Sequence, residues 1–293
     1  MDQADSLRNL AAEGRLARPG LKVFAVTSGK GGVGKSNIAA NLAIHVAKTG
    51  KRVLVIDADL GLANIEIIFG LKPRFHLGDV LGSGRPIEEV LVQGPHGISL
   101  LPAGSGVQSL TQLSDAEKMQ FITALDPLEE MFDVVFIDSG AGIGDNVLFF
   151  VGAAQEAILV VSPEPTSLID AYAVVKVLSQ QAGVNSFSVI VNPVVDEMVA
   201  RGVFHKLTAV TNRFLNARIR HLGYVPRDEN FHRAIMAQRP IVDMFPSSPA
   251  SRALGDISRR LFEGLPATKL DSGLKVMWQR LLRESTAHAG DVR

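Results

Sequence analysis

Cysteine is absent from this chain of 293 residues, and tryptophan occurs once. Without cysteine the chain cannot form disulfides, thiolate zinc sites or an iron–sulfur cluster held by its own side chains. An excess of charge of one sign is also missing, because 30 basic and 30 acidic residues give a formal net charge of zero. No global field attracts nucleic acid or a membrane, so any such contact has to be local.

Long apolar runs are lacking too. No uninterrupted apolar stretch approaches the ~20 residues that a transmembrane helix needs. The first residues include acidic side chains and contain no apolar core run, so they do not resemble a signal peptide. We expect a soluble, cytoplasmic protein. Its 46% hydrophobic and 20% charged residues are ordinary globular composition, sufficient for a sizeable core.

Short, continuous apolar runs alternate with helical patterns along most of the chain. This alternation predicts an α/β fold with a mostly parallel sheet flanked by helices on both faces. In such sheets ligands bind beyond the carboxyl ends of the strands. The predicted strands are 22–28, 52–56, 98–101, 133–137, 157–161, 188–191 and 222–225. The main predicted helices are 114–131, 166–182, 196–219, 228–238 and 249–263.

A glycine-rich loop joins the first apolar run to the helical pattern that follows it. The loop fits G-x-x-x-x-G-K-[ST], and the strand–loop–helix context that this motif requires is present. Its glycines let the backbone wrap phosphates, while its amides and the positive end of the helix point at the anion. Lys35 is expected to neutralise the β- and γ-phosphates of ATP, and Ser36 to ligate Mg²⁺. The predicted nucleotide-binding residues of this single P-loop NTPase domain are Gly29, Lys30, Gly31, Gly32, Val33, Gly34, Lys35, Ser36 and Asn37.

Lys30 is not demanded by the P-loop motif. The run SGKGGVGKSN at 28–37 resembles the deviant Walker A motif of the MinD- and ParA-like ATPases. In that family the early lysine reaches the nucleotide of the partner subunit in an ATP-dependent dimer. The resemblance therefore implies a homodimer in the ATP state, with Lys30 in the role that an arginine finger has in other P-loop enzymes.

Three aspartates follow predicted strands. Asp57 and Asp59 suit one role in Mg²⁺ binding or loop ordering and one in holding the attacking water. Asp138 ends a strand at the position where P-loop enzymes hold their metal directly or through water. Residues 57–64 resemble the switch D-x-D-x-G-L-x-N of MinD-like proteins, which implies that Asp59 positions the water and that Gly61 and Asn64 belong to the switch. The predicted metal ligands are Ser36, Asp57 and Asp138, and the predicted catalytic residues are Lys30, Lys35 and Asp59.

Recognition of the base rests on segments that follow the later strands. Asn192 and the segment Pro226-Arg227-Asp228 resemble the adenine contacts of the family, although an Asn–Pro pair is also a common turn. The guanine-reading N-K-x-D motif of many GTPases is absent, which favours ATP.

Other segments resemble the flagellar branch of the family, the FlhG (FleN) ATPases that control flagellar number. MinD proteins more often have proline where Gly140 stands in DSGAGI (138–143), whereas the glycine form resembles the flagellar relatives. Residues 201–215 are similar to the same branch. The N-terminal residues 2–8 resemble its D-Q-A-x-x-L-R element, which stimulates the FlhF GTPase. The resemblance implies an FlhF-type partner that contacts Asp2, Gln3, Ala4, Leu7 and Arg8, and it leaves open a flagellar transcriptional activator as a further partner.

The C-terminal segment contains a basic amphipathic pattern that includes the only tryptophan. Its apolar residues follow one helical face. Such a helix either docks on the core or lies on a membrane surface. MinD-like proteins end in a membrane-targeting helix, so the resemblance implies a peripheral position at the inner face of the cell membrane. Dimerisation would double this weak anchor and make attachment ATP-dependent. The predicted membrane contacts are Leu274, Met277, Trp278, Leu281 and Leu282.

We therefore expect three parts: a partner-binding helix at 1–20, an ATPase domain at 21–266 and a membrane-targeting helix at 267–293. A MinD- or ParA-type ATPase that positions the division site, DNA or other cargo is the main alternative function. No sequence-specific nucleic-acid binding is expected, and the zero net charge disfavours a DNA-partitioning role. A metallocluster carrier is excluded because it needs cysteine ligands. A binding module that holds nucleotide without turnover remains open.

Overall fold

The computed structural model describes residues 20–59, 64–102 and 123–263. Within them, eight strands form one sheet with the order β3-β4-β2-β5-β1-β6-β7-β8. All neighbours pair in parallel except β3 and β4, which are antiparallel. The strands are β1 Lys22–Ser28, β2 Val53–Ala58, β3 Val92–Gln93, β4 Ser99–Pro102, β5 Val134–Ala141, β6 Glu156–Val161, β7 Ser186–Val194 and β8 Arg218–Pro226.

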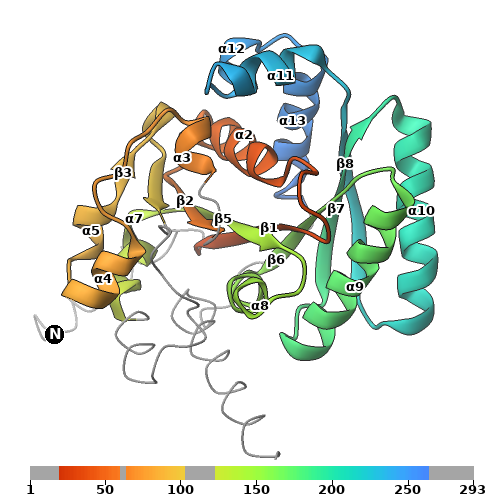
Figure 1. Cartoon of the computed structure of the whole chain (residues 1–293), viewed down its shortest axis with the longest axis horizontal. Coiled ribbons are helices and arrows are strands. Elements are labelled where there is room, and N and C mark those ends of the chain that lie inside the picture. Colours follow the sequence, from red (N-terminus) through yellow and green to blue (C-terminus); the bar gives the residue numbers. More distant parts are fainter. Residues whose placement is uncertain (1–19, 60–63, 103–122, 264–293) are drawn as a thin grey trace, which may run out of the picture.

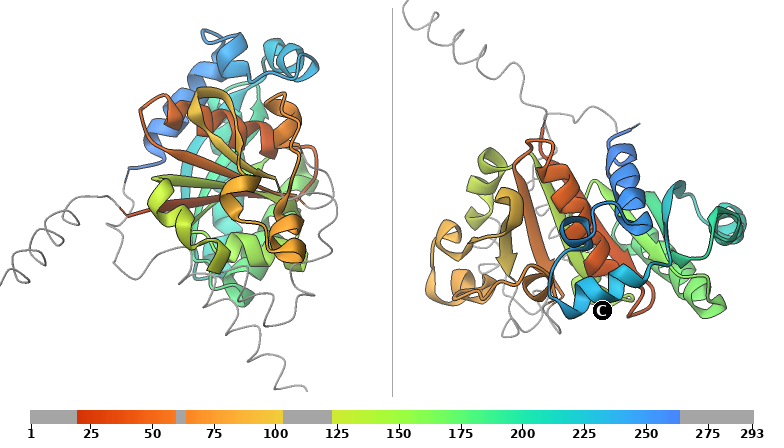
Figure 2. Two further views of the ribbon diagram at one scale, coloured as in Figure 1. Left: turned by 90° about the vertical axis from the view of Figure 1, so that its left-hand side faces the viewer. Right: turned by 90° about the horizontal axis from the view of Figure 1, so that it is seen from above.

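Helices cover both faces of the sheet, and the side view in Figure 2 shows the resulting layers. One face packs against α2 Lys35–Ala47, α3 Ile65–Ile68, the 3-10 turn η1 Pro95–Gly97, α11 Glu229–Met236, α12 Ile241–Met244 and α13 Pro249–Arg260. The other face packs against α4 Leu77–Ser83, α5 Ile87–Val90, α7 Asp126–Met131, α8 Asp145–Gly152, α9 Pro165–Gln181 and α10 Glu197–Phe214 (Figure 1). The predicted fold class is confirmed.

Two apolar cores explain why the central strands read as unbroken hydrophobic runs. In β1, Val23 and Ala25 face the core under α8 and α9, while Phe24 and Val26 face the core under α2. Both faces are therefore shielded from water, so alternation with polar residues is not needed. The same reasoning applies to β6, all of whose residues are buried.

Several predicted boundaries change. The predicted helix 196–219 is wrong at its end, because α10 stops at Phe214 and Arg218 already begins β8. The last strand is longer than 222–225, since it reaches from Arg218 to Pro226. The two-residue strand β3 and the short helices α3, α4, α5, α8 and α12 were not predicted. Residues 114–122 of one predicted helix lie outside the described part of the chain.

Candidate functional site

The phosphate loop connects β1 to α2 at the carboxyl edge of the sheet. Two of its glycines have left-handed backbone angles, with φ of 78° at Gly32 and 88° at Gly34. Residues with a Cβ rarely adopt such angles, which explains the glycine that the motif G-x-x-x-x-G-K-[ST] requires at Gly34 and the additional glycine of this loop at Gly32. The helix α2 begins at Lys35, directly after the loop, so its unpaired N-terminal amides face the space that the loop encloses.

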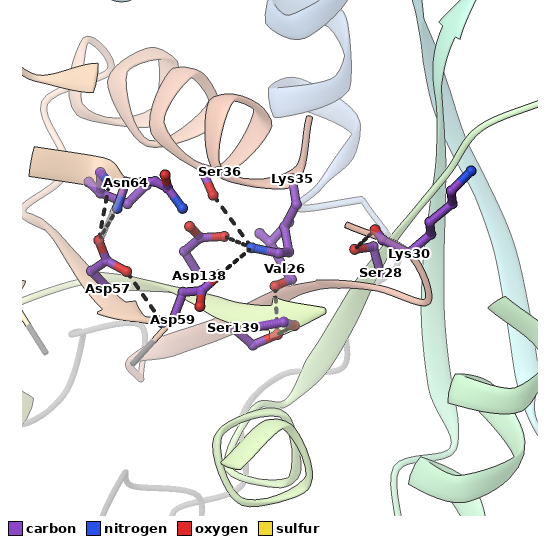
Figure 3. A network of polar contacts seen from close by, with 12 residues as sticks. Val26, Ser28, Lys30, Lys35, Ser36, Asp57, Asp59, Asn64, Asp138 and Ser139 are labelled. Carbon is purple, nitrogen blue, oxygen red and sulfur yellow. Dashed lines mark hydrogen bonds and ion pairs between the residues drawn. The ribbon is translucent and has the colours of Figure 1, made fainter. Parts of the chain in front are cut away.

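Lys35 is the centre of a polar cluster built from neighbouring strands (Figure 3). Its Nζ lies 3.1 Å from Asp138 Oδ1 and 3.8 Å from Asp59 Oδ2, and it donates to Ser36 Oγ at 3.4 Å. Asp138 comes from β5, and Asp59 follows β2, which lies beside β5 in the sheet. The order of the strands thus brings together residues that are far apart in the sequence.

Asp138 is fully buried, and its two carboxylate oxygens differ. Oδ1 pairs with Lys35, whereas no described residue donates a hydrogen bond to Oδ2. Burial raises the pKa of Asp138, while the charge of Lys35 and the hydroxyl of Ser36 act in the opposite direction. A buried carboxylate oxygen without a partner, beside the Ser36 hydroxyl, fits a divalent cation or its water. Mg²⁺ typically takes few protein ligands and completes its shell with phosphates and water.

Asp57 is buried on β2, and backbone amides surround its carboxylate. Oδ2 accepts hydrogen bonds from the amides of Asn64 and Ile65, both at 3.0 Å, and Oδ1 accepts one from the amide of Asp59 at 3.3 Å. Burial, reinforced by the nearby charge of Asp138, raises the pKa of Asp57 to about 7, against the effect of these amides. Asp57 was expected either to bind Mg²⁺ or to order the loop that follows it. These contacts favour loop ordering, and the role of Asp57 as a metal ligand stays a prediction.

Asp59 is partly exposed and lies beside Gly140, near the end of β5. A Cβ built on Gly140 would lie 3.9 Å from Asp59 Oδ1 and 3.6 Å from a methyl group of Val147. Both distances are ordinary van der Waals contacts, so the space beside the carboxylate would accept a Cβ at this position. The predicted switch residue Gly61 lies outside the described part of the chain.

A pocket of about 270 Å³ lies beside the phosphate loop, on the side of β7 and β8. Asn192 donates from Nδ2 to the carbonyl of Val33 at 2.7 Å and so connects the end of β7 to the loop. The predicted residues Asn37, Asn192, Pro226 and Asp228 all line this pocket together with Gly32, Val33 and Gly34. Arg227, which belongs to the same predicted segment as Pro226 and Asp228, also lines the pocket. Sequence reasoning did not single out the remaining lining residues, which are Pro193, Phe231, His232 and Ile235.

The contacts of Asp228 differ from those expected of a base contact. Its Oδ1 accepts from the amide of Asn230 at 2.9 Å, and its Oδ2 accepts from the amide of Ala250 at 3.1 Å. Burial acts to raise the pKa of Asp228, but these amides and nearby side chains outweigh it, and the pKa is lowered. Asp228 therefore fixes the starts of α11 and α13. The sequence does contain a signal for three of the missed residues. Phe231, His232 and Ile235 are three, four and seven positions after Asp228, a spacing that places them on one side of the helix that Asp228 begins.

Lys30 lies apart from the Lys35 cluster. Figure 3 shows its side chain directed away from Lys35 and Asp138. Its Nζ is 2.5 Å from Glu164 Oε2, just before α9. The predicted partner-binding residues 2–8 and membrane contacts 274–282 lie outside the described residues. Within the described ranges, no helix has the length and apolar character needed to cross a membrane.

Comparisons with known proteins find relatives over most of the chain. A ParA family model described as "NUBPL iron-transfer P-loop NTPase" matches residues 21–262. The Antiactivator FleN of Pseudomonas aeruginosa is 43% identical over 82% of this chain and 86% of its own length. The Flagellum site-determining protein YlxH of Helicobacter pylori is 32% identical over 89% of this chain and 90% of its own.

Solved structures give the same fold. The MinC:MinD cell division protein complex of Aquifex aeolicus contains a chain with 33% identity and a TM-score of 0.68, covering 85% of this chain and 98% of that one. The iron transfer named in the family description does not extend to this chain through thiolate ligands, because the chain has no cysteine.

Proposed function

The chain belongs to the ParA/MinD family of P-loop NTPases and is an ATPase, and on that premise we propose that it is an ATP-driven switch that regulates flagellar number or placement. The observation that carries the flagellar assignment is the 43% identity with an antiactivator named FleN. The similarity to a flagellum site-determining protein supports the same assignment. An antiactivator acts on an activator, so a flagellar transcriptional activator becomes a candidate partner.

ATP binds with its phosphates in the loop Gly29–Ser36 and its base in the pocket beside Asn192. Ser36 and Asp138 would hold Mg²⁺, with Asp57 ordering the loop or assisting. The bound ion would neutralise charge that builds up on the phosphates during the reaction. Lys35, which is buried between carboxylates in the structure, would exchange part of that pairing for the β- and γ-phosphates.

Hydrolysis needs a positioned water and a group that stabilises the transferring phosphoryl. Asp59 accepts a hydrogen bond from the water, whose oxygen attacks the γ-phosphorus while the bond to the β–γ bridging oxygen breaks. ADP and inorganic phosphate are the products. Lys30 cannot serve its own site in the observed conformation, since it points away from Lys35. By the family resemblance Lys30 acts instead on the nucleotide of a second subunit, so turnover would require a dimer.

The ends of the chain connect this cycle to its partners. We divide the chain into a partner-binding segment at 1–20, the ATPase domain at 21–266 and a membrane-targeting segment at 267–293. The first segment would stimulate an FlhF-type GTPase. The last would attach the dimer to the inner face of the cell membrane, because two weak anchors on one particle bind far better than one.

The Asp59→Ala variant tests the hydrolytic switch. It should bind ATP, turn it over at least about 100-fold more slowly, and accumulate as a dimer in sizing experiments with ATP. Asp256→Ala is a matched control, since Asp256 is an exposed aspartate on α13 that forms an ion pair with the surface residue Arg259. Turnover by Asp59→Ala at the wild-type rate would show that Asp59 does not position the attacking water.

Membrane binding and DNA binding separate the flagellar proposal from the partitioning alternative. Sedimentation with anionic lipid vesicles should retain the protein in ATP but not in ADP. A gel shift at low salt should show no DNA binding, because the net charge is zero. Salt-sensitive DNA binding together with no vesicle binding would favour a ParA-type role.

A further inference from the structure

Lys30 is held in a defined resting position by a carboxylate of its own chain. The distance from its Nζ to Glu164 Oε2 is 2.5 Å, and Figure 3 shows the side chain extended away from Lys35 and Asp138. Lys30 and Glu164 are separated by 134 residues, so this pair exists only because the fold places β1 beside β6. The carboxylate stands at the N-cap position of α9.

The backbone around Lys30 is fixed tightly enough to make this pairing specific. A Cβ built on Gly29 would lie 2.3 Å from the carbonyl carbon of Asp170 and 2.6 Å from the amide nitrogen of Ala171, both in α9. Only glycine lets the loop approach the helix so closely. In addition, Ser28 Oγ donates to the carbonyl of Lys30 at 2.9 Å. The start of the loop is thus seated on the first turns of α9, within reach of Glu164.

The pair is nevertheless easily broken. The side chains of Lys30 and Glu164 are 42% and 61% exposed, in contrast with Lys35, whose side chain is 8% exposed. Exposed ion pairs of this kind change an equilibrium by up to about fivefold, and less at high salt. Such a contact can set the resting position of a side chain without preventing its departure when a stronger anionic partner becomes available.

We propose that Glu164 is a positioning residue that restrains Lys30 in the monomer, and that dimer closure requires Lys30 to leave Glu164 for the phosphates of the partner's nucleotide. This inference rests on the proposed function, since it assumes that Lys30 acts in a second subunit. Each closed dimer releases two lysines, because a symmetric dimer uses both. The restraint therefore opposes dimerisation by up to about 25-fold, the square of the effect on one lysine.

The test compares Glu164→Gln with wild type in Mg-ATP, in the full chain. The amide keeps the size of the side chain and removes its charge. The variant should dimerise at a lower protein concentration, by up to about 25-fold, and its specific ATPase activity should rise at concentrations where wild type is monomeric. At saturating protein concentration the two activities should converge. Unchanged or weaker dimerisation of Glu164→Gln would overturn the proposal.

Two further variants separate this proposal from a general effect of charge and from the proposed function itself. Glu89→Gln is the matched control, because Glu89, on α5, forms a 2.6 Å surface pair with Arg85, outside the phosphate loop. In a Lys30→Ala background, Glu164→Gln should have no further effect on dimerisation. If that substitution still promotes dimerisation there, Glu164 does not act through Lys30. If Lys30→Ala alone leaves ATP-dependent dimerisation and turnover intact, the proposed function fails, whatever Glu164 does.

Discussion

Replacing Gly34 with alanine should destabilise the nucleotide-free protein through two separable effects. Gly34 has φ of 88° at the start of α2, a conformation that disfavours any residue with a Cβ. A Cβ at this position would also lie 2.5 Å from Asn192 Nδ2, which is closer than real Cβ contacts. Asn192 would have to move and lose its 2.7 Å hydrogen bond to the carbonyl of Val33.

Gly32 provides the control that isolates the first effect. Its φ is 78°, but a Cβ there would meet nothing within 4 Å. The left-handed angle costs alanine about 1–2 kcal/mol, and the reduced freedom of the unfolded chain returns about 0.4–1 kcal/mol. Gly32→Ala should therefore lose roughly 1 kcal/mol of unfolding free energy. Gly34→Ala should lose about 1 kcal/mol more, which is the typical net contribution of a hydrogen bond.

The unfolding free energies of wild type and both variants are measured by urea denaturation, without nucleotide and with a metal chelator. The extra loss in Gly34→Ala should disappear in an Asn192→Ala background, because the atom that the new Cβ meets is then gone. Equal losses in the two glycine variants would refute the reasoning, as would an extra loss that persists without the Asn192 side chain. ATP affinity is expected to fall in both variants, since both glycines lie in the phosphate loop.

Further predictions concern the carboxylates and the pocket. The pKa of Asp57 rises from 3.8 to about 7 on folding, so between these values the folded state binds one proton more than the unfolded state. Protonation of Asp57 therefore stabilises the folded state at low pH, and this contribution to the unfolding free energy is lost as the pH rises from 4 to 8. Relative to Asp57→Asn, the unfolding free energy of nucleotide-free wild type should therefore fall by up to about 4 kcal/mol across that range, and a flat difference would contradict the burial argument. Asp138→Asn should reduce ATP turnover at least about 100-fold and remove the Mg²⁺ dependence of ATP binding, as measured by titrations with Mg²⁺ and with chelator. Phe231→Ala should raise the KM for ATP about tenfold with little change in kcat, whereas Met236→Ala, on the same helix but outside the pocket lining, should leave KM unchanged.

The fold class was predictable because its signals are local. The central strands are apolar throughout, since both faces are buried, and the helices between them follow a different pattern. The edges of the sheet were less predictable. The strand β3 has only two residues, too few to form a pattern, and β8 begins four residues after α10 ends, inside the predicted helix. At an edge a strand pairs with one neighbour only, and for β8 that neighbour is β7, about thirty residues earlier in the sequence (Ser186 pairs with Arg218).

In the candidate site, too, some features were predictable from the sequence and others were not. The sequence by itself determined the phosphate loop, because the loop glycines, Lys35 and Ser36 are contiguous and their roles follow from backbone geometry and charge. Only the tertiary structure decided which partners these residues have. Asp138 meets Lys35 because β5 lies between β1 and β2, Asn192 reaches the loop from β7, and Glu164 meets Lys30 because Gly29 lets the loop rest on α9. Hydrogen bonds and ion pairs act over a few ångströms in space. Sheet order and packing set those distances, and sequence spacing does not encode them.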